Sequence, residues 1–182
     1  MQIEKELLQG CIEKDRKSQN KLYELIFSYL MNICMRYKND YDTAGTSLNA
    51  IFLKVLDNLD KFENEQVFIP WIKRIAVNHL IDEYRSDKTK KIDYIENYQD
   101  YIAPTTAHEK EEQLESEYLL DLIRQLPPTT MRVFNLYALD GYKHREIADL
   151  LSISESTSKW HLGEARKRLQ VMLEQFKQIT AL

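Results

Sequence analysis

The chain has 182 residues, of which 43% are hydrophobic, and a formal net charge of −4. This length suits one domain or two small ones. The glycines are far apart, which excludes a glycine-rich phosphate loop, and residues 25–33 form the longest apolar stretch, well short of the ~20 residues that span a bilayer. With no apolar signal-peptide segment at the N-terminus, the sequence predicts a cytoplasmic protein without a membrane partner.

Four amphipathic helices are expected in the first half, separated by polar segments at 15–18, 38–42 and 61–66. Pro70 fits the first turn of the fourth helix. The two cysteines form no CxxC pair and fall on apolar faces, which predicts packed, reduced thiols. The expected inner faces are Ile3, Leu7, Leu8, Cys11 and Ile12; Leu22, Leu25, Ile26, Tyr29, Leu30, Ile33 and Tyr37, with Cys34 beside them; Leu48, Ile51, Phe52, Val55, Leu56 and Leu59; and Phe68, Trp71, Ile72, Ile75, Ala76, His79 and Leu80.

The outer face of the fourth helix is basic. Lys73, Arg74, Asn78 and Arg85 lie on it, and residues 71–91 hold six Lys/Arg against three Asp/Glu. Basic residues interleaved with aromatic rings are typical of surfaces that bind single-stranded nucleic acid. An ordinary solvated helix, whose aromatic rings belong to the core, is the alternative.

A polar stretch at 86–112 follows, with a short helical turn expected at 94–98. Residues 92–126 hold nine Asp/Glu against two Lys/Arg, so the negative charge of the chain is concentrated here. A connection this long favours two domains over one. We therefore predict an all-α fold with helical domains at 1–91 and 113–182, joined by a flexible acidic linker at 92–112.

The second domain is expected to contain four helices. The first carries Tyr118, Leu119, Leu122, Ile123 and Leu126 and ends at Pro127. Pro128 is expected at the first position of the next helix, with Val133, Phe134, Leu136 and Tyr137 apolar, and Gly141 near its end.

Residues 143–169 have the pattern of a helix-turn-helix. Ile147, Leu150 and Leu151 form the apolar face of a first short helix, and Ser154 is expected to cap the second. In such motifs the second helix enters the DNA major groove. A helical hairpin buried in some other all-α protein is the alternative. The inner face of the second helix is Ser158, Leu162, Ala165 and Leu169, and the outer face is Ser156, Lys159, Trp160, Gly163 and Arg166.

Three ordered motifs resemble one family. They are PWIKRIAVNHLIDEYR at 70–85, LPPTTMRVFNLYALDGYKHREIADLLSIS at 126–154 and ESTSKWHLGEARKRL at 155–169. Together they resemble the extracytoplasmic-function (ECF) group of bacterial sigma-70 RNA polymerase sigma factors. The resemblance covers roughly residues 7–173, and three motifs in order are more specific than one alone.

The resemblance implies a sigma factor that binds core RNA polymerase and directs promoter-specific transcription initiation, without catalysis and without a cofactor or metal. An anti-sigma factor is left open as a further partner. The implied minus-thirty-five DNA contacts are Arg145, Ser154, Ser156, Thr157, Lys159, Trp160, Arg166 and Lys167. The implied minus-ten contacts are Asn64, Phe68, Lys73, Arg74, Asn78 and Arg85, and the implied polymerase contacts are Asn49, Ala50 and Leu53.

The chain departs from the family pattern at several positions. Residues 46–52 read TSLNAIF where the family usually has D-x-x-Q-E-x-F. Ser152 replaces the glycine of the turn, Ser158 replaces an apolar residue of the second helix, and Glu164 replaces an arginine.

Two other functions remain open from the sequence. One is a stand-alone helix-turn-helix transcription regulator with a sensing or dimerising N-terminal domain. The other is an enzyme with a metal held by His79, Asp82 and Glu83, which fall within about one helical turn. The triplet has no further His or Cys ligand nearby, and such clusters are usually solvated or part of a core.

Overall fold

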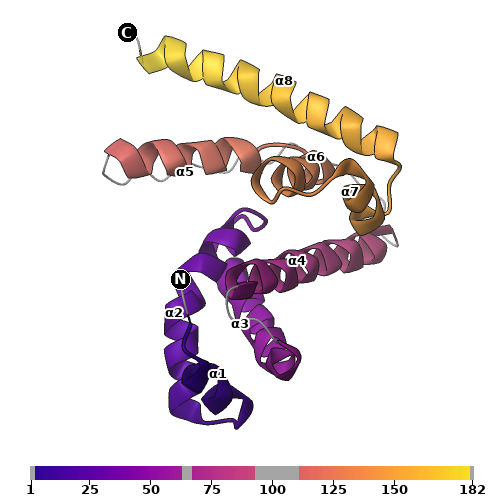
Figure 1. The fold of residues 1–182 in the computed structure, drawn as a ribbon. Coiled ribbons are helices and arrows are strands. Elements are labelled where there is room, and N and C mark those ends of the chain that lie inside the picture. The colour runs from indigo at the N-terminus through magenta and orange to yellow at the C-terminus, as the bar shows by residue number, and fades with distance from the viewer. Residues whose placement is uncertain (1–2, 63–66, 93–110, 181–182) are drawn as a thin grey trace. The chain divides into compact units, whose positions relative to one another are not determined.

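The computed structural model describes residues 3–62, 67–92 and 111–180, which form helices and turns without a strand (Figure 1). This confirms the all-α fold. The chain divides into two compact units, Met1–Thr89 and Lys90–Leu182. The predicted helical turn at 94–98, most of the predicted linker and Asn64 lie outside the described residues.

The first unit contains four α-helices among its described residues. Asp15 caps the second, since its carboxylate accepts a hydrogen bond from the Ser18 amide at 2.8 Å. Asp40 caps the third through the Thr43 amide, also at 2.8 Å. Both contacts satisfy amides that a helix leaves unbonded at its start. The elements are α1 (Lys5–Ile12), α2 (Arg16–Met35), α3 (Tyr41–Asp57), the 3₁₀ turn η1 (Leu59–Lys61) and α4 (Phe68–Ile92).

Two of the expected boundaries in this unit were wrong. The segment at 15–18 is not a break but the cap and first turn of α2. The helix that starts with Phe68 continues to Ile92, through residues that we had assigned to the polar stretch. Lysine, aspartate and serine are all tolerated in a helix, so polarity alone does not end one.

The core of the first unit lies where α2 packs against α1 and α3, and α4 contributes a buried face to it. Ile12 and Leu25 were expected inside but are 39% and 43% exposed, because each flanks the buried stripe of its helix. Conversely, Val77 and Ile81 of α4 are buried although neither was expected to be. The largest fully buried side chains are Leu22, Ile26, Leu30, Leu48, Ile51, Val55, Leu59, Phe68, Ile72 and Ile81.

A close approach between α1 and α2 requires a glycine. A Cβ atom at Gly10 would lie 2.3 Å from Ser18 Oγ and 2.9 Å from Ser18 Cβ. Ser18 Oγ is itself held by a 2.7 Å hydrogen bond to Asp15, so it cannot move away without losing that bond.

We expect Gly10→Ala to destabilise the protein. Overpacking of this kind costs about 1–3 kcal/mol, and the gain in helix propensity offsets it by only about 0.5–1 kcal/mol. Gly45→Ala in α3 is the matched control, because a Cβ there meets nothing within 4 Å, and it should be neutral or stabilising. Urea denaturation of both variants, followed by circular dichroism, measures the difference, and equal effects would contradict the close approach.

The second unit also contains four α-helices among its described residues. As expected, Pro128 occupies the start of α6, and Gly141 adopts a left-handed conformation with φ of +82° before α7. The elements are α5 (Glu111–Arg124), α6 (Pro128–Phe134), the π-helical turn η3 (Asn135–Leu139), α7 (His144–Leu151) and α8 (Glu155–Thr180) (Figure 1).

The turn η3 was not predicted. In it the Asp140 amide donates to the Asn135 carbonyl at 2.9 Å, a bond over five residues. A π turn inserts one residue into the helical spacing, which changes the direction of the side chains that follow.

The core of the second unit differs from the expected one at one position of α5, because Leu119, expected inside, is 47% exposed. The core cluster is Ile123, Leu126, Met131 and Ala165, with Phe134 and Leu169 packed against it.

Among the described residues, none of the helices is both long enough and apolar enough to cross a membrane.

Candidate nucleic-acid interface

The interface is built on the turn between α7 and α8. Ser152 adopts a left-handed conformation (φ 53°, ψ 48°), which reverses the chain after α7. The Ile153 amide donates to the Ala148 carbonyl at 3.0 Å. Ser154 then caps α8, because its Oγ accepts from the Thr157 amide at 3.0 Å. This confirms Ser154 as the N-cap, and it gives Ser154 and Thr157 a structural role besides the predicted contact with DNA.

The start of α7 is also fixed by a local contact. The Lys143 amide donates to the Glu146 carboxylate at 2.8 Å. A carboxylate in the first turn both bonds a free amide and faces the positive end of the helix. Arg145, one of the predicted minus-thirty-five DNA contacts, is the residue before Glu146 and is exposed.

The two faces of α8 differ as the sequence predicts. Ser158 and Ala165 are fully buried and Leu162 is 4% exposed. On the opposite side Trp160 is 62% exposed, the largest apolar ring on that face. The exposed side chains of this face are Ser156, Lys159, Trp160, Arg166 and Lys167, and the exposed Gly163 lies between them in sequence.

Two ion pairs restrain charged side chains along α8. Lys159 Nζ lies 2.7 Å from Glu155, and Arg168 Nε lies 2.6 Å from Glu164. These contacts lower the pKa of both carboxyls. Arg166 instead lies over the Tyr137 ring, 6.0 Å from its centroid. Glu164, which replaces the arginine of the family pattern, therefore forms an ion pair with Arg168 of the same helix.

Two hydrogen bonds that we did not predict hold α8 in place. Ser158 Oγ is 2.9 Å from His144 Nδ1, and His161 Nδ1 is 2.9 Å from Thr130 Oγ1. The His144 ring also stacks on Tyr137, with centroids 4.6 Å apart. The sequence contained a signal for the first of these bonds, because Ser158 falls on the inner face of α8 and a buried hydroxyl needs a hydrogen-bond partner.

The basic face of α4 shows mixed exposure. Arg74 and Arg85 are exposed, whereas Lys73 and Asn78 are half-buried. Phe68 is completely buried in contact with Phe62 and Trp71, at centroid distances of 5.3 and 5.7 Å. A ring in this position does not reach a DNA base, so its predicted DNA contact is corrected to a role in the core.

The three predicted polymerase contacts lie on α3. Leu53 is 61% exposed, Asn49 is exposed and Ala50 is half-buried. Asn49 Oδ1 accepts a hydrogen bond from the Tyr23 hydroxyl at 2.9 Å. The Tyr23 ring also meets Phe52 edge-on, with centroids 4.9 Å apart, so α2 and α3 jointly support this surface.

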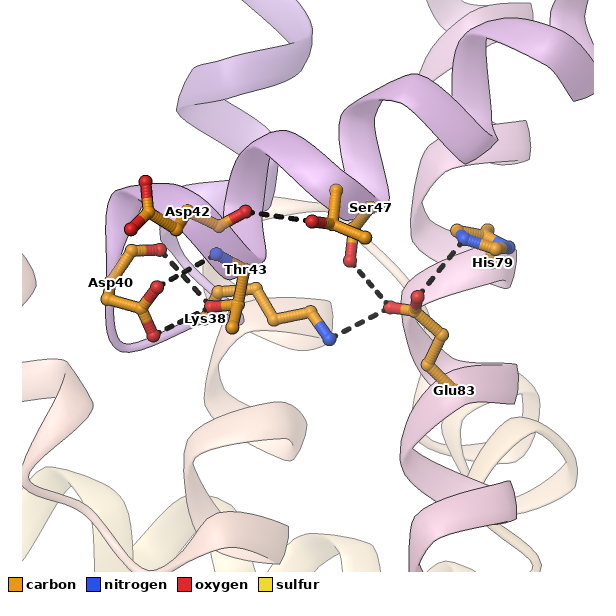
Figure 2. Close-up of polar contacts among 8 residues, drawn as sticks. Lys38, Asp40, Asp42, Thr43, Ser47, His79 and Glu83 are labelled. Atoms are coloured by element: carbon orange, nitrogen blue, oxygen red, sulfur yellow. Dashed lines mark hydrogen bonds and ion pairs between the residues drawn. The ribbon is translucent and has the colours of Figure 1, made fainter.

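His79 and Glu83, two of the three candidate metal ligands, belong to a polar cluster in the first unit (Figure 2). Glu83 Oε2 accepts bonds from Lys38 Nζ at 2.9 Å and Ser47 Oγ at 2.8 Å, and Glu83 Oε1 lies 3.3 Å from His79 Nε2. Asp82 is exposed and is not part of it. Within the described part of the chain, no three His, Cys, Asp or Glu side chains are grouped as metal ligands would be.

The pKa values of this cluster follow from burial and pairing. Burial raises the pKa of Glu83, but the bonds from Lys38 and Ser47 outweigh it and the net shift is downward. Burial lowers the pKa of His79, and the nearby Glu83 only partly opposes this. The folded protein therefore keeps His79 neutral to a lower pH than the unfolded chain does.

We expect His79 to make stability depend on pH. Below its ordinary pKa of 6.5 the unfolded chain takes up a proton that the fold resists, so stability falls as pH drops from 6.5 toward the lowered folded pKa. Melting temperatures of the wild type and His79→Gln between pH 7.5 and 5.5 test this. The variant should show a flatter profile, and parallel profiles would contradict the assignment.

The two buried cysteines are free thiols, as expected. Burial raises the pKa of Cys11 to about 11 and that of Cys34 to about 12. Both are therefore protonated and unreactive at neutral pH.

Family comparisons match both units. The sequence model described as Sigma-70 region 2 matches residues 22–90, and that described as Sigma-70, region 4 matches residues 116–169. The second match contains the helix-turn-helix. The chain belongs to the sigma-70 family. Its relatives include members of the ECF group, as the resemblance implied, and the function of the chain is that of a sigma factor directing transcription initiation.

Curated relatives support the same family along most of the chain. RNA polymerase sigma factor SigZ of Bacillus subtilis (strain 168) is 28% identical over 143 residues, 75% of this chain and 76% of the relative. ECF RNA polymerase sigma factor SigM of the same organism is 24% identical over 156 residues, 84% and 93% of the two chains. RNA polymerase sigma factor CarQ of Myxococcus xanthus is 27% identical over 131 residues, 71% and 74% of the two chains.

A solved structure shares the fold. The sigma factor RpoE from Bartonella quintana, in complex with the anti-sigma factor NepR, matches with a TM-score of 0.53 and 18% identity, over 85% of this chain and 96% of that one.

The region 2 match accounts for the first unit, so the alternative of a stand-alone regulator with a sensing or dimerising domain is set aside. The sigma-70 family is not known for enzymatic activity.

Proposed function

We propose that this sigma factor binds core RNA polymerase and places the exposed face of α8 in the major groove of an upstream promoter element. The observation that carries the proposal is that α8 has one buried face and one exposed face. Ser158, Leu162 and Ala165 are buried on one side, while Lys159 and Trp160 are exposed on the other. A helix anchored in this way presents one fixed set of side chains to DNA.

Within the second unit, base contacts and phosphate contacts fall to different residues. Ser156, Lys159 and Trp160 lie at the centre of the exposed face and suit base edges. Arg145, Arg166 and Lys167 suit phosphates, which position a protein without specifying sequence. Ser154, the N-cap of α8, and Thr157 in its first turn are proposed to add contacts to the DNA backbone.

The domain at 1–91 is proposed to open the minus-ten element and to bind the polymerase, with residues 92–112 as linker. Arg74 and Arg85, exposed on α4, would contact the DNA backbone, and Lys73 and Asn78 would line the same surface. Asn64 belongs to this proposal from its place in the sequence. The polymerase contact is assigned to Asn49, Ala50 and Leu53, because Leu53 is the most exposed large apolar residue of α3.

The remaining parts of the proposal concern cell context. We propose a cytoplasmic protein without enzymatic activity or a cofactor, since transcription takes place in the bacterial cytoplasm. An anti-sigma factor is added as a proposed partner by analogy with the Bartonella quintana RpoE, which was solved with one bound.

Transcription in vitro tests the proposal. The full chain is mixed with core polymerase and a library of duplex promoters randomised in the upstream and minus-ten elements, and transcripts are sequenced. We expect transcripts from a defined subset of promoters that core polymerase alone does not produce. A chain that forms dimers and does not bind core polymerase would contradict the proposal.

Arg166→Ala should weaken all active promoters by a similar factor. Loss of one phosphate contact also reduces the slope of log affinity against log salt by about one. Arg168→Ala is the matched control, because this arginine is already paired with Glu164 on the same helix. Promoter binding by the holoenzyme at several salt concentrations measures both effects. A change of promoter preference with Arg166→Ala would show that this side chain contacts bases.

A further inference from the structure

Trp160 differs from the other residues on the exposed face of α8. It is 62% exposed, and it is the only large apolar side chain among the outward-facing residues 156–167. Polar and charged side chains on this face can contact either phosphates or base edges. An indole ring gains little from a phosphate, so its place on this face needs a different partner.

The indole is held by a neighbour that is itself fixed. The His161 ring meets the Trp160 ring edge-on, with centroids 4.9 Å apart and an angle of 72°. His161 is tied through Nδ1 to Thr130, which is only 2% exposed. An exposed side chain with a restrained ring loses less conformational freedom on binding than a mobile one does.

The surroundings of the ring leave it open to a ligand. Gly163, one turn further along α8, has no side chain, and a Cβ there would meet nothing within 4 Å. Lys159 pairs with Glu155, toward the start of the helix. Ser156, one turn before the ring, is small and hydrogen-bonded to Ser154 at 2.8 Å. A base edge can therefore approach the indole without first displacing a bulky neighbour.

We propose that Trp160 determines promoter specificity by packing its indole against the C5-methyl group of a thymine in the upstream element. The thymine methyl is the apolar group that base edges present in the major groove. Arg145 and Arg166, which are exposed on α7 and α8, supply the positive charge that a duplex requires. This inference rests on the proposed function of α8 and adds the base for which it selects.

Removal of single methyl groups tests the inference. A duplex is first selected from the randomised library with the wild-type holoenzyme, and each upstream thymine is then replaced by deoxyuridine, which pairs identically but lacks the methyl. We expect wild-type binding to fall about fourfold at one or two positions, the ratio that burial of one methyl group predicts. Trp160→Ala should bind the thymine and deoxyuridine duplexes equally.

Two further variants keep the test decisive. Trp160→Gln retains a long side chain and should likewise lose the methyl effect, so the test does not depend on the alanine variant folding. Val171→Ala, which truncates another exposed apolar residue of α8, should keep the full effect. Equal methyl dependence in the wild type and Trp160→Gln, or none in the wild type, would overturn the inference. A holoenzyme that selects no sequence would instead overturn the proposed function.

Discussion

Glu83→Ala should destabilise the first unit by roughly 2–4 kcal/mol, because it removes the acceptor of two hydrogen bonds and leaves their donors, Ser47 and Lys38, without a partner for these bonds. Ser47 is only 2% exposed, so its hydroxyl cannot turn to water when the carboxylate is lost. The Lys38 and Glu83 side chains are 23% and 29% exposed, so solvent screens their pairing only in part. The bonds join α4 to α3 and to the segment that follows α2 (Figure 2).

Urea denaturation of the full chain, monitored by circular dichroism, measures this cost. Asp82→Ala is the matched control, since Asp82 is exposed on the same helix and lies outside the cluster, and it should change stability by less than about 0.5 kcal/mol. Glu83→Gln keeps an acceptor for Ser47 and should fall between the two. The cluster would have no structural role if Glu83→Ala cost no more than Asp82→Ala.

The same carboxylate predicts acid sensitivity. The folded pKa of Glu83 lies below its ordinary value of 4.5, so its contribution to stability is present above that pH and is lost as pH falls through the folded pKa. This range lies below the one expected for His79. The wild type should therefore lose stability in two stages on acidification. Glu83→Gln should show a smaller lower stage, to which other carboxyls with lowered pKa values, such as Asp15 and Asp40, still contribute.

Leu162→Ala should cost about 2–5 kcal/mol of stability, the range observed for truncation of a buried leucine. Leu162 is 4% exposed on the inner face of α8, between the buried Ser158 and Ala165. The cost has two sources, the lost burial of the side chain and the cavity that remains. Leu162→Met, which conserves volume, should cost less than about 1.5 kcal/mol.

Two controls separate this effect from changes at the exposed face. Leu119→Ala makes the same chemical change at a site that is 47% exposed, and it should be much milder. Lys159→Ala removes only an exposed ion pair, worth less than about 1 kcal/mol, and should alter promoter choice instead. If Lys159→Ala lowered the melting temperature as much as Leu162→Ala, the orientation of α8 would be wrong.

Properties that depend on neighbours along the chain were determined by the sequence alone. Helical periodicity correctly separated the buried Leu162 and Ala165 from the exposed Lys159 and Trp160, because residues three and four apart share a face. Ser154 as a cap and Gly141 at a left-handed turn followed from residue chemistry within a few positions. The all-α fold and the family resemblance rest on the same local patterns.

Only the tertiary structure decided which distant polar groups meet. Glu83 lies 36 residues from Ser47, and Thr130 lies 31 residues from His161, so neither pairing has a periodic signature in the sequence. Helix packing brings these partners together, and the need to satisfy buried polar groups then fixes their bonds. For Phe68 the sequence supported two expectations, an inner-face position from periodicity and a DNA contact from the family resemblance, and the contacts with Phe62 and Trp71 favour the first.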